Sequence, residues 1–128
     1  MAVRIVRLGT PRMPHEGIRI GTVRRPPRGV PKTEFASGNW YDVWFPNLAP
    51  SLETMKLGLD AATEQQWKVF VKCYLAEMAQ PDASRVLDVL AALSKQSNFS
   101  VGCYCQEEAR CHRSLLGQLF RDRGARFA

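Results

Sequence analysis

The stretch "FSVGCYCQEEARCHRSLLGQLF", residues 99–120, combines the pattern of a buried strand with that of the helix that follows it. At its start, apolar and small or polar residues alternate, which predicts a strand over residues 98–105. Apolar residues at helical spacing come next, so we expect a helix from about His112 to a stop at Gly124. A strand that runs into a helix in this way is typical of an α/β fold.

The same patterns continue through the rest of the chain. Alternating residues predict strands at 3–8, 18–23 and 41–46. Apolar stripes predict a short helix at 52–58 with Ser51 as its N-cap, and longer helices at 63–79 and about 82–96. We therefore expect an α/β fold of the Rossmann-like kind, in which a mainly parallel sheet is flanked by helices and residues 1–128 form a single compact layered domain.

Composition limits the cellular setting and the state of the cysteines. The chain has 128 residues and four cysteines, and it contains no apolar run of the length that a membrane span needs. Its first residues lack the pattern of a secretory signal, so we expect a cytoplasmic protein without a membrane partner. Because cytoplasmic thiols are kept reduced, clustered cysteines indicate metal ligands, redox centres or nucleophiles.

Positive charge is concentrated at the start of the chain. The net charge is +6, and residues 1–32 contain eight basic residues but a single acidic one, Glu16. An anionic partner is therefore expected to bind this quarter, although a solvated basic face would give the same composition. Three basic residues in the loop after the second predicted strand are the candidates for anion binding: Arg24, Arg28 and Lys32.

The cysteines of the opening stretch are candidates for nucleophilic or redox chemistry. Cys103 lies on the predicted strand, whereas Cys111 and His112 lie where a helix N-terminus presents unpaired N–H groups and partial positive charge. Such a position favours the thiolate, so Cys111 is the better candidate nucleophile, with Cys103 as a second thiol and His112 as acid or base. Arg113 and Ser114, in the first helical turn, are candidates to bind an anion.

Metal binding is the alternative for this cluster, with Cys103, Cys105, Cys111 and His112 as its ligands. Adjacent residues within a helix point about 100° apart, which counts against Cys111 and His112 as ligands of one ion. A third alternative is purely structural, with cysteines that pack in the interior.

Several motifs together resemble the YeaO-like family, a family of bacterial and archaeal domains of unknown function. The resemblance covers nearly the whole chain and is carried by Arg24, Pro27-Arg28-Gly29, Lys32, Asp42, Trp44, Leu48-Ala49-Pro50-Ser51, Trp67, Phe70, Tyr74, Cys103 and Cys111-His112-Arg113-Ser114. It implies a compact α/β domain. One branch of the family has a glutamate at the position of Cys105, which makes Cys105 the least secure ligand of the metal set.

These observations lead to one main hypothesis about function and two alternatives. The main hypothesis is binding of an anionic, phosphate-bearing small molecule where the basic loop and the cysteine cluster meet at strand ends, with possible cysteine chemistry. The alternatives are a nucleic-acid-binding module that uses the basic quarter, and a structural domain with a Cys/His zinc site. No feature of the sequence identifies a cofactor.

Overall fold

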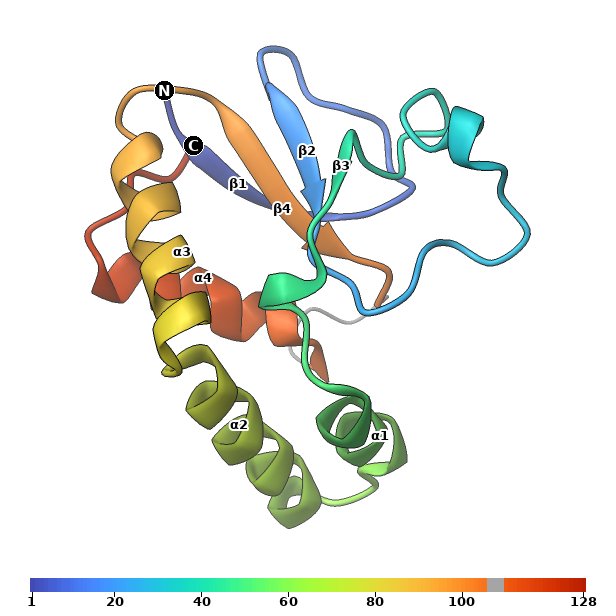
Figure 1. The fold of residues 1–128 in the computed structure, drawn as a ribbon, viewed down its shortest axis with the longest axis vertical. Coiled ribbons are helices and arrows are strands. Elements are labelled where there is room, and N and C mark those ends of the chain that lie inside the picture. Colours follow the sequence, from blue (N-terminus) through green and yellow to red (C-terminus); the bar gives the residue numbers. More distant parts are fainter. Residues whose placement is uncertain (106–109) are drawn as a thin grey trace.

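Four parallel strands form the sheet at the centre of the protein (Figure 1). The computed structural model describes residues 1–105 and 110–128. The strands are β1 (Val3–Arg7), β2 (Ile18–Gly21), β3 (Val43–Trp44) and β4 (Phe99–Cys103), in the order β1-β4-β2-β3. Strand β4 is therefore central, with Cys103 opposite Arg7 of β1 and Gly102 opposite Gly21 of β2.

The helices begin close to the positions that the sequence predicts. They are α1 (Leu52–Asp60), α2 (Glu64–Met78), α3 (Pro81–Leu93) and α4 (His112–Asp122), with short 3₁₀ turns η1 (Lys32–Glu34) and η2 (Pro46–Leu48). Ser51 caps α1, because its side chain accepts a hydrogen bond from the Thr54 amide. Thr63 and Gln66 form a capping box at the start of α2.

The main core lies between the sheet and helices α2, α3 and α4. It contains Val3 and Val101 from the strands, together with Tyr74, Leu87 and Phe120 from the three helices. The Tyr74 hydroxyl donates a hydrogen bond of 2.8 Å to the Leu48 carbonyl, so this buried polar atom also has a partner. Figure 1 shows these helices on one side of the sheet.

Loops and a polar network cover the opposite face of the sheet. The Tyr41 ring packs directly on Gly21, where any side chain would overlap the ring. Next to it, the Arg19 guanidinium is fully buried and pairs with Glu16 at 2.8 Å, while the Ser100 hydroxyl donates to the same carboxylate at 2.6 Å. This second face is thus held by hydrogen bonds as well as by apolar packing.

The expected strand at 41–46 is wrong in its length, because only Val43–Trp44 pair with β2. The Asp42 carboxylate accepts a hydrogen bond of 2.8 Å from the Arg19 amide, and so takes the place of a backbone carbonyl there. Pro46 lacks an amide hydrogen to continue the ladder at the other end. The predicted fold class is nevertheless confirmed: the chain forms a compact α/β domain with a parallel sheet.

Candidate functional site

Cys103 and Cys111 meet at the carboxyl end of the central strand. Cys103 is the last residue of β4, and Cys111 is the N-cap of α4. Their Sγ atoms lie at the bonding distance of a disulfide, their Cα atoms are 7.8 Å apart, and the residues are only 1% and 2% exposed. Disulfides usually join Cα atoms that are less than about 7 Å apart, so this backbone spacing is wide for a direct bond between the sulfurs.

His112 faces the same two sulfurs with one ring nitrogen. Its Nε2 lies 2.6 Å from the Thr22 carbonyl, which can only accept, so Nε2 bears the proton. Burial lowers the pKa of His112 to about 4, so the ring is neutral near pH 7. Nδ1 is then an acceptor, 3.8 Å from the Cys111 sulfur.

The expectation that Cys111 and His112 point apart is wrong, because Cys111 is not helical. Its φ of −136° and ψ of 148° are extended, and the helix begins only at His112. The extended N-cap turns the Cys111 side chain back toward the imidazole. The objection to Cys111 and His112 as neighbouring ligands of one ion therefore does not hold in this structure.

Cys105 lies outside this group of donors. The ligand atoms of Cys103, Cys111 and His112 are all within 4.8 Å of one another, whereas the Cys105 side chain is exposed. Cys105 lines a small cleft of about 70 Å³ that Cys111 and His112 also reach. Arg110 lies beside this cleft, with its guanidinium 5.4 Å from the Trp67 ring centre.

The two polar residues at the start of α4 make contacts within the protein. Arg113 is buried, and its Nη2 donates a hydrogen bond of 2.7 Å to the Cys105 carbonyl. The Arg113 Nε has no hydrogen-bond partner among the residues that the structure describes. The Ser114 hydroxyl donates to the Cys111 carbonyl at 2.9 Å, as a residue in a first helical turn commonly does.

The basic residues of the loop after β2 are placed at three different locations. Arg24 donates to the carbonyls of Pro46, Ala49 and Pro50 at 2.9–3.2 Å, so it holds the segment before α1. Lys32 lies in η1, beside a cavity on the loop-covered side of the sheet. Arg28 lines a different cavity, at the carboxyl ends of the strands.

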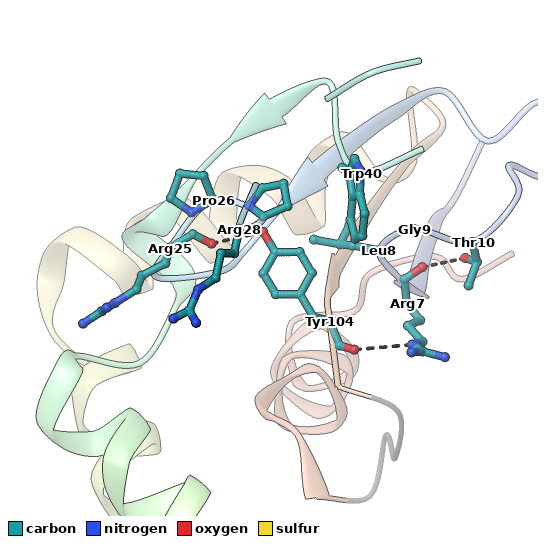
Figure 2. Close-up of a pocket in the computed structure, with 10 residues that line it drawn as sticks. Arg7, Leu8, Gly9, Thr10, Arg25, Pro26, Arg28, Trp40 and Tyr104 are labelled. Atoms are coloured by element: carbon teal, nitrogen blue, oxygen red, sulfur yellow. Dashed lines mark hydrogen bonds between the residues drawn. The ribbon is translucent and has the colours of Figure 1, made fainter. Parts of the chain in front are cut away.

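That cavity, which we call the arginine pocket, has a volume of about 530 Å³ and is shown in Figure 2. Three arginines line it, one from the end of β1 and two from the loop after β2. Two aromatic residues and one aliphatic residue also line it. We define the arginine pocket by six of its lining residues: Arg7, Leu8, Arg25, Arg28, Trp40 and Tyr104. No carboxylate among residues 1–105 and 110–128 lines it.

Tyr104 stands at the centre of the arginine pocket, between Arg28 and Arg7 in Figure 2. Its hydroxyl donates to the Arg25 carbonyl at 3.0 Å, and its own carbonyl accepts from Arg7 Nε at 3.3 Å. Burial raises the pKa of Tyr104, so the hydroxyl stays protonated. The rings of Tyr104 and Trp40 meet edge to face, 5.8 Å between centres. These contacts hold two aromatic side chains beside the arginines.

Sequence reasoning did not select most residues of this pocket. Arg7, Arg25 and Tyr104 each lie at or just after the carboxyl end of a predicted strand, which is a signal that a search of strand ends would use. Trp40 does not follow a strand end, because it lies in the loop before β3.

In the described part of the chain, no helix combines the length and apolarity needed to cross a membrane.

Comparisons with known proteins agree with the resemblance drawn from the motifs. The sequence model of a family described as "Active DUF488-N3 subclade" matches residues 3–124. Neither a curated protein nor a solved structure gives a significant match to the chain. The family match spans both the basic loop and the cysteine cluster. The protein therefore belongs to the DUF488 family, which includes the YeaO-like proteins, and within it to the DUF488-N3 subclade.

Proposed function

We propose that this protein binds a phosphate-bearing small molecule with a planar ring, such as a nucleotide, in the arginine pocket. The observation that carries the proposal is the gathering of Arg7, Arg25 and Arg28 around the Tyr104 and Trp40 rings in one cavity. Guanidinium groups bind phosphate oxygens in pairs of charge-assisted hydrogen bonds, and aromatic faces stack on planar rings.

The size and position of the pocket support the same ligand class. A volume of about 530 Å³ falls within the range of about 300 to 1,000 Å³ that is usual for small-molecule sites. In open parallel sheets, ligands commonly bind beyond the carboxyl ends of the strands. Arg28 is the one predicted anion-binding residue that lines the pocket, so Arg7 and Arg25 join it in the proposed site.

A thermal-shift panel tests this proposal. The panel contains inorganic phosphate, pyrophosphate, a sugar phosphate and the common nucleoside monophosphates, each added to the wild-type protein and to Arg25→Ala/Arg28→Ala. We expect a nucleoside phosphate at about a hundred times its Kd to raise the wild-type Tm by at least about 5 °C. The double variant should lose this response.

Arg85→Ala is the matched control, because Arg85 is an exposed arginine on α3 that does not line the pocket. It should respond like the wild type. An unresponsive wild type, or a double variant that responds as the wild type does, contradicts the proposal. Equal stabilisation by inorganic phosphate and by nucleotides contradicts the role of the aromatic rings.

Nucleic-acid binding through the basic quarter remains the alternative for the same arginines. It predicts that affinity for an oligonucleotide falls steeply with salt, since each neutralised phosphate releases counterions. It also predicts that an oligonucleotide binds much more tightly than its component mononucleotide. A mononucleotide that binds as well as the oligonucleotide favours the small-molecule proposal.

Thiol chemistry at Cys111 is a second candidate function, favoured by the acceptor nitrogen of His112 at 3.8 Å from the sulfur. A neutral imidazole at this distance is placed to accept a hydrogen bond from the thiol, but its lowered pKa makes it a weak base for the thiol proton. In reduced, metal-free protein, Cys111 should react with iodoacetamide faster than Cys73 at the same pH, and His112→Gln should slow that reaction. A rate no faster than that of Cys73 on α2 would contradict this candidate.

A further inference from the structure

We propose that Cys103, Cys111 and His112 bind one zinc ion through two thiolates and the imidazole Nδ1, with the fourth coordination position open to the cleft beside Cys105. The three donor atoms lie within 4.8 Å of one another, and all three residues are buried. This set, two sulfurs and one imidazole, is one of the known protein ligand sets for zinc with an open position. The proposal goes beyond the ligand of the arginine pocket and does not depend on it.

One spacing within the donor set already fits a single ion, and the backbone lets the two sulfurs separate to fit it as well. At ordinary Zn–S and Zn–N bond lengths, neighbouring ligand atoms lie roughly 3.3–3.8 Å apart, and Nδ1 of His112 is 3.8 Å from the Cys111 sulfur. The Cα atoms of Cys103 and Cys111 are 7.8 Å apart. That spacing leaves room for the two sulfurs to separate around an ion without moving the strand or the helix.

The hydrogen bond from His112 to Thr22 gives the imidazole the orientation that a metal ligand needs. Because Nε2 donates to the Thr22 carbonyl at 2.6 Å, the lone pair of Nδ1 is directed to the cysteine side. Thr22 itself is fixed, since its amide and hydroxyl both donate to the Gly102 carbonyl at 3.0 and 2.9 Å. A backbone carbonyl that holds the second ring nitrogen is a usual outer partner of a zinc-bound histidine.

Charge balance also favours a divalent cation at this position. The two thiols each lose a proton on binding, so two thiolates neutralise Zn²⁺ and the neutral imidazole adds no charge. A site without net charge suits residues that are 1%, 2% and 8% exposed, where an unpaired ion would be costly. Arg113, which is buried in the first turn of α4, directs its Nη2 to the Cys105 carbonyl.

The cleft supplies space for the fourth ligand. Its volume of about 70 Å³ is enough for about two water molecules, and Cys111 and His112 both line it. Since the Cys105 side chain is exposed and outside the donor cluster, water is the fourth ligand that we assign. A zinc ion and the Cys111 thiol would both interact with the same Nδ1 lone pair of His112. The zinc site and the thiol candidate therefore describe two different states of the cluster, with and without metal.

Zinc retention in the full-length, reduced protein tests the proposal. The protein is loaded with zinc, dialysed against metal-free buffer and analysed for metal, alongside single variants of each cysteine and of His112. We expect about one zinc per wild-type chain, because a Cys₂His set binds tightly at neutral pH. Cys103→Ser, Cys111→Ser and His112→Gln should weaken zinc binding at least about tenfold, while Cys73→Ser and Cys105→Ser retain the metal.

Thiol labelling of the wild type keeps the test decisive if a cluster variant does not fold. Zinc should protect Cys103 and Cys111 from iodoacetamide and leave the labelling of Cys73 and Cys105 unchanged. A wild type that keeps no zinc, or zinc that leaves Cys103 and Cys111 unprotected, overturns the site. Loss of zinc from Cys105→Ser overturns the open position, because it makes Cys105 the fourth ligand.

Discussion

At the scale of single residues, Glu16 provides the buried counter-charge for Arg19 in the basic first quarter of the chain. It is buried together with Arg19, whose guanidinium is 0% exposed and donates to both carboxylate oxygens of Glu16 at 2.8 and 3.0 Å. The remaining donors of Arg19 bind the carbonyls of Thr10 and Asn39 at 2.8 Å. The ion pair thus fixes the loop that follows β1 and the loop that precedes β3.

Replacing Glu16 with Gln should destabilise the fold strongly. The variant leaves the Arg19 charge buried without its counter-charge, and loss of one partner of a buried pair costs about 3–5 kcal/mol. The free energy of unfolding in urea measures the effect, with Glu34→Gln as control because Glu34 is exposed on η1. A change of less than about 1 kcal/mol relative to this control would contradict the role of the pair.

The same carboxylate should make stability depend on pH in the acid range. Burial alone raises the pKa of Glu16, but hydrogen bonds from Arg19, Ser100 and the Met13 amide outweigh it and lower the pKa from 4.5 to about 2. A depressed pKa in the folded state stabilises the fold above the unfolded-state value. This contribution, about 3 kcal/mol, should disappear as the pH falls from about 5 to about 2.

Unfolding free energies measured across this pH range, for the wild type and Glu16→Gln, check the prediction. The wild type should lose more stability than the variant as the pH falls, since the variant has no carboxylate to protonate at this position. Parallel pH profiles for the two proteins would show that Glu16 is not the group responsible.

At the scale of elements, Arg24 links the end of β2 to the start of α1. Its three hydrogen bonds to the carbonyls of Pro46, Ala49 and Pro50 hold η2 and the segment that leads to the N-cap Ser51. The nearby Arg25 is exposed and lines the arginine pocket. The two adjacent arginines should therefore differ in what their removal changes.

Arg24→Ala should lower the free energy of unfolding by about 2 kcal/mol, since hydrogen bonds from a charged group contribute more than neutral ones. Arg25→Ala should change stability by less than about 0.5 kcal/mol and instead weaken the thermal-shift response to nucleotides. Chemical denaturation of both variants separates the two roles. Full stability in Arg24→Ala, together with a lost nucleotide response, would return Arg24 to the anion-binding role that the sequence suggests.

Most elements could be predicted because their signals are local. The apolar stripe of α2, the Ser51 N-cap and the strand-to-helix sequence around β4 each depend on residues close together in the chain. Strand β3 could not be predicted at its true length, because the Asp42 side chain replaces a backbone partner of Arg19. This side-chain hydrogen bond joins residues that are 23 positions apart in the chain, so a local pattern does not reveal it.

At the scale of the whole molecule, the order of the strands decides which residues form the pocket. Arg7 ends β1, Tyr104 directly follows β4 and Arg25 follows β2. These three strands are neighbours only because β4 lies between β1 and β2. Local patterns do not contain this order, so the sequence predicts an anion site at strand ends but only one of its arginines, Arg28. The cysteine cluster was predictable, since its residues are close in sequence.

The fold also separates structural arginines from those that are available to a ligand. Arg19 pairs with Glu16, Arg12 pairs with Asp42 at 2.8 Å, and Arg24 binds carbonyls, although all three belong to the same basic quarter. Charge counting along the sequence cannot make this distinction, because it depends on which side chains are buried. The proposed site consists of three other arginines, Arg7, Arg25 and Arg28, which line the arginine pocket.

The most direct test of the proposed function is NMR of the arginine side chains during titration with the phosphate compound that gives the largest thermal shift. The Nε–H signals of Arg7, Arg25 and Arg28, and the indole signal of Trp40, should shift together with one Kd. The signals of Arg19 and Arg24 should stay in place, since these groups bind within the protein. Shifts confined to arginines outside the pocket, or no shifts at saturating ligand, would contradict the account.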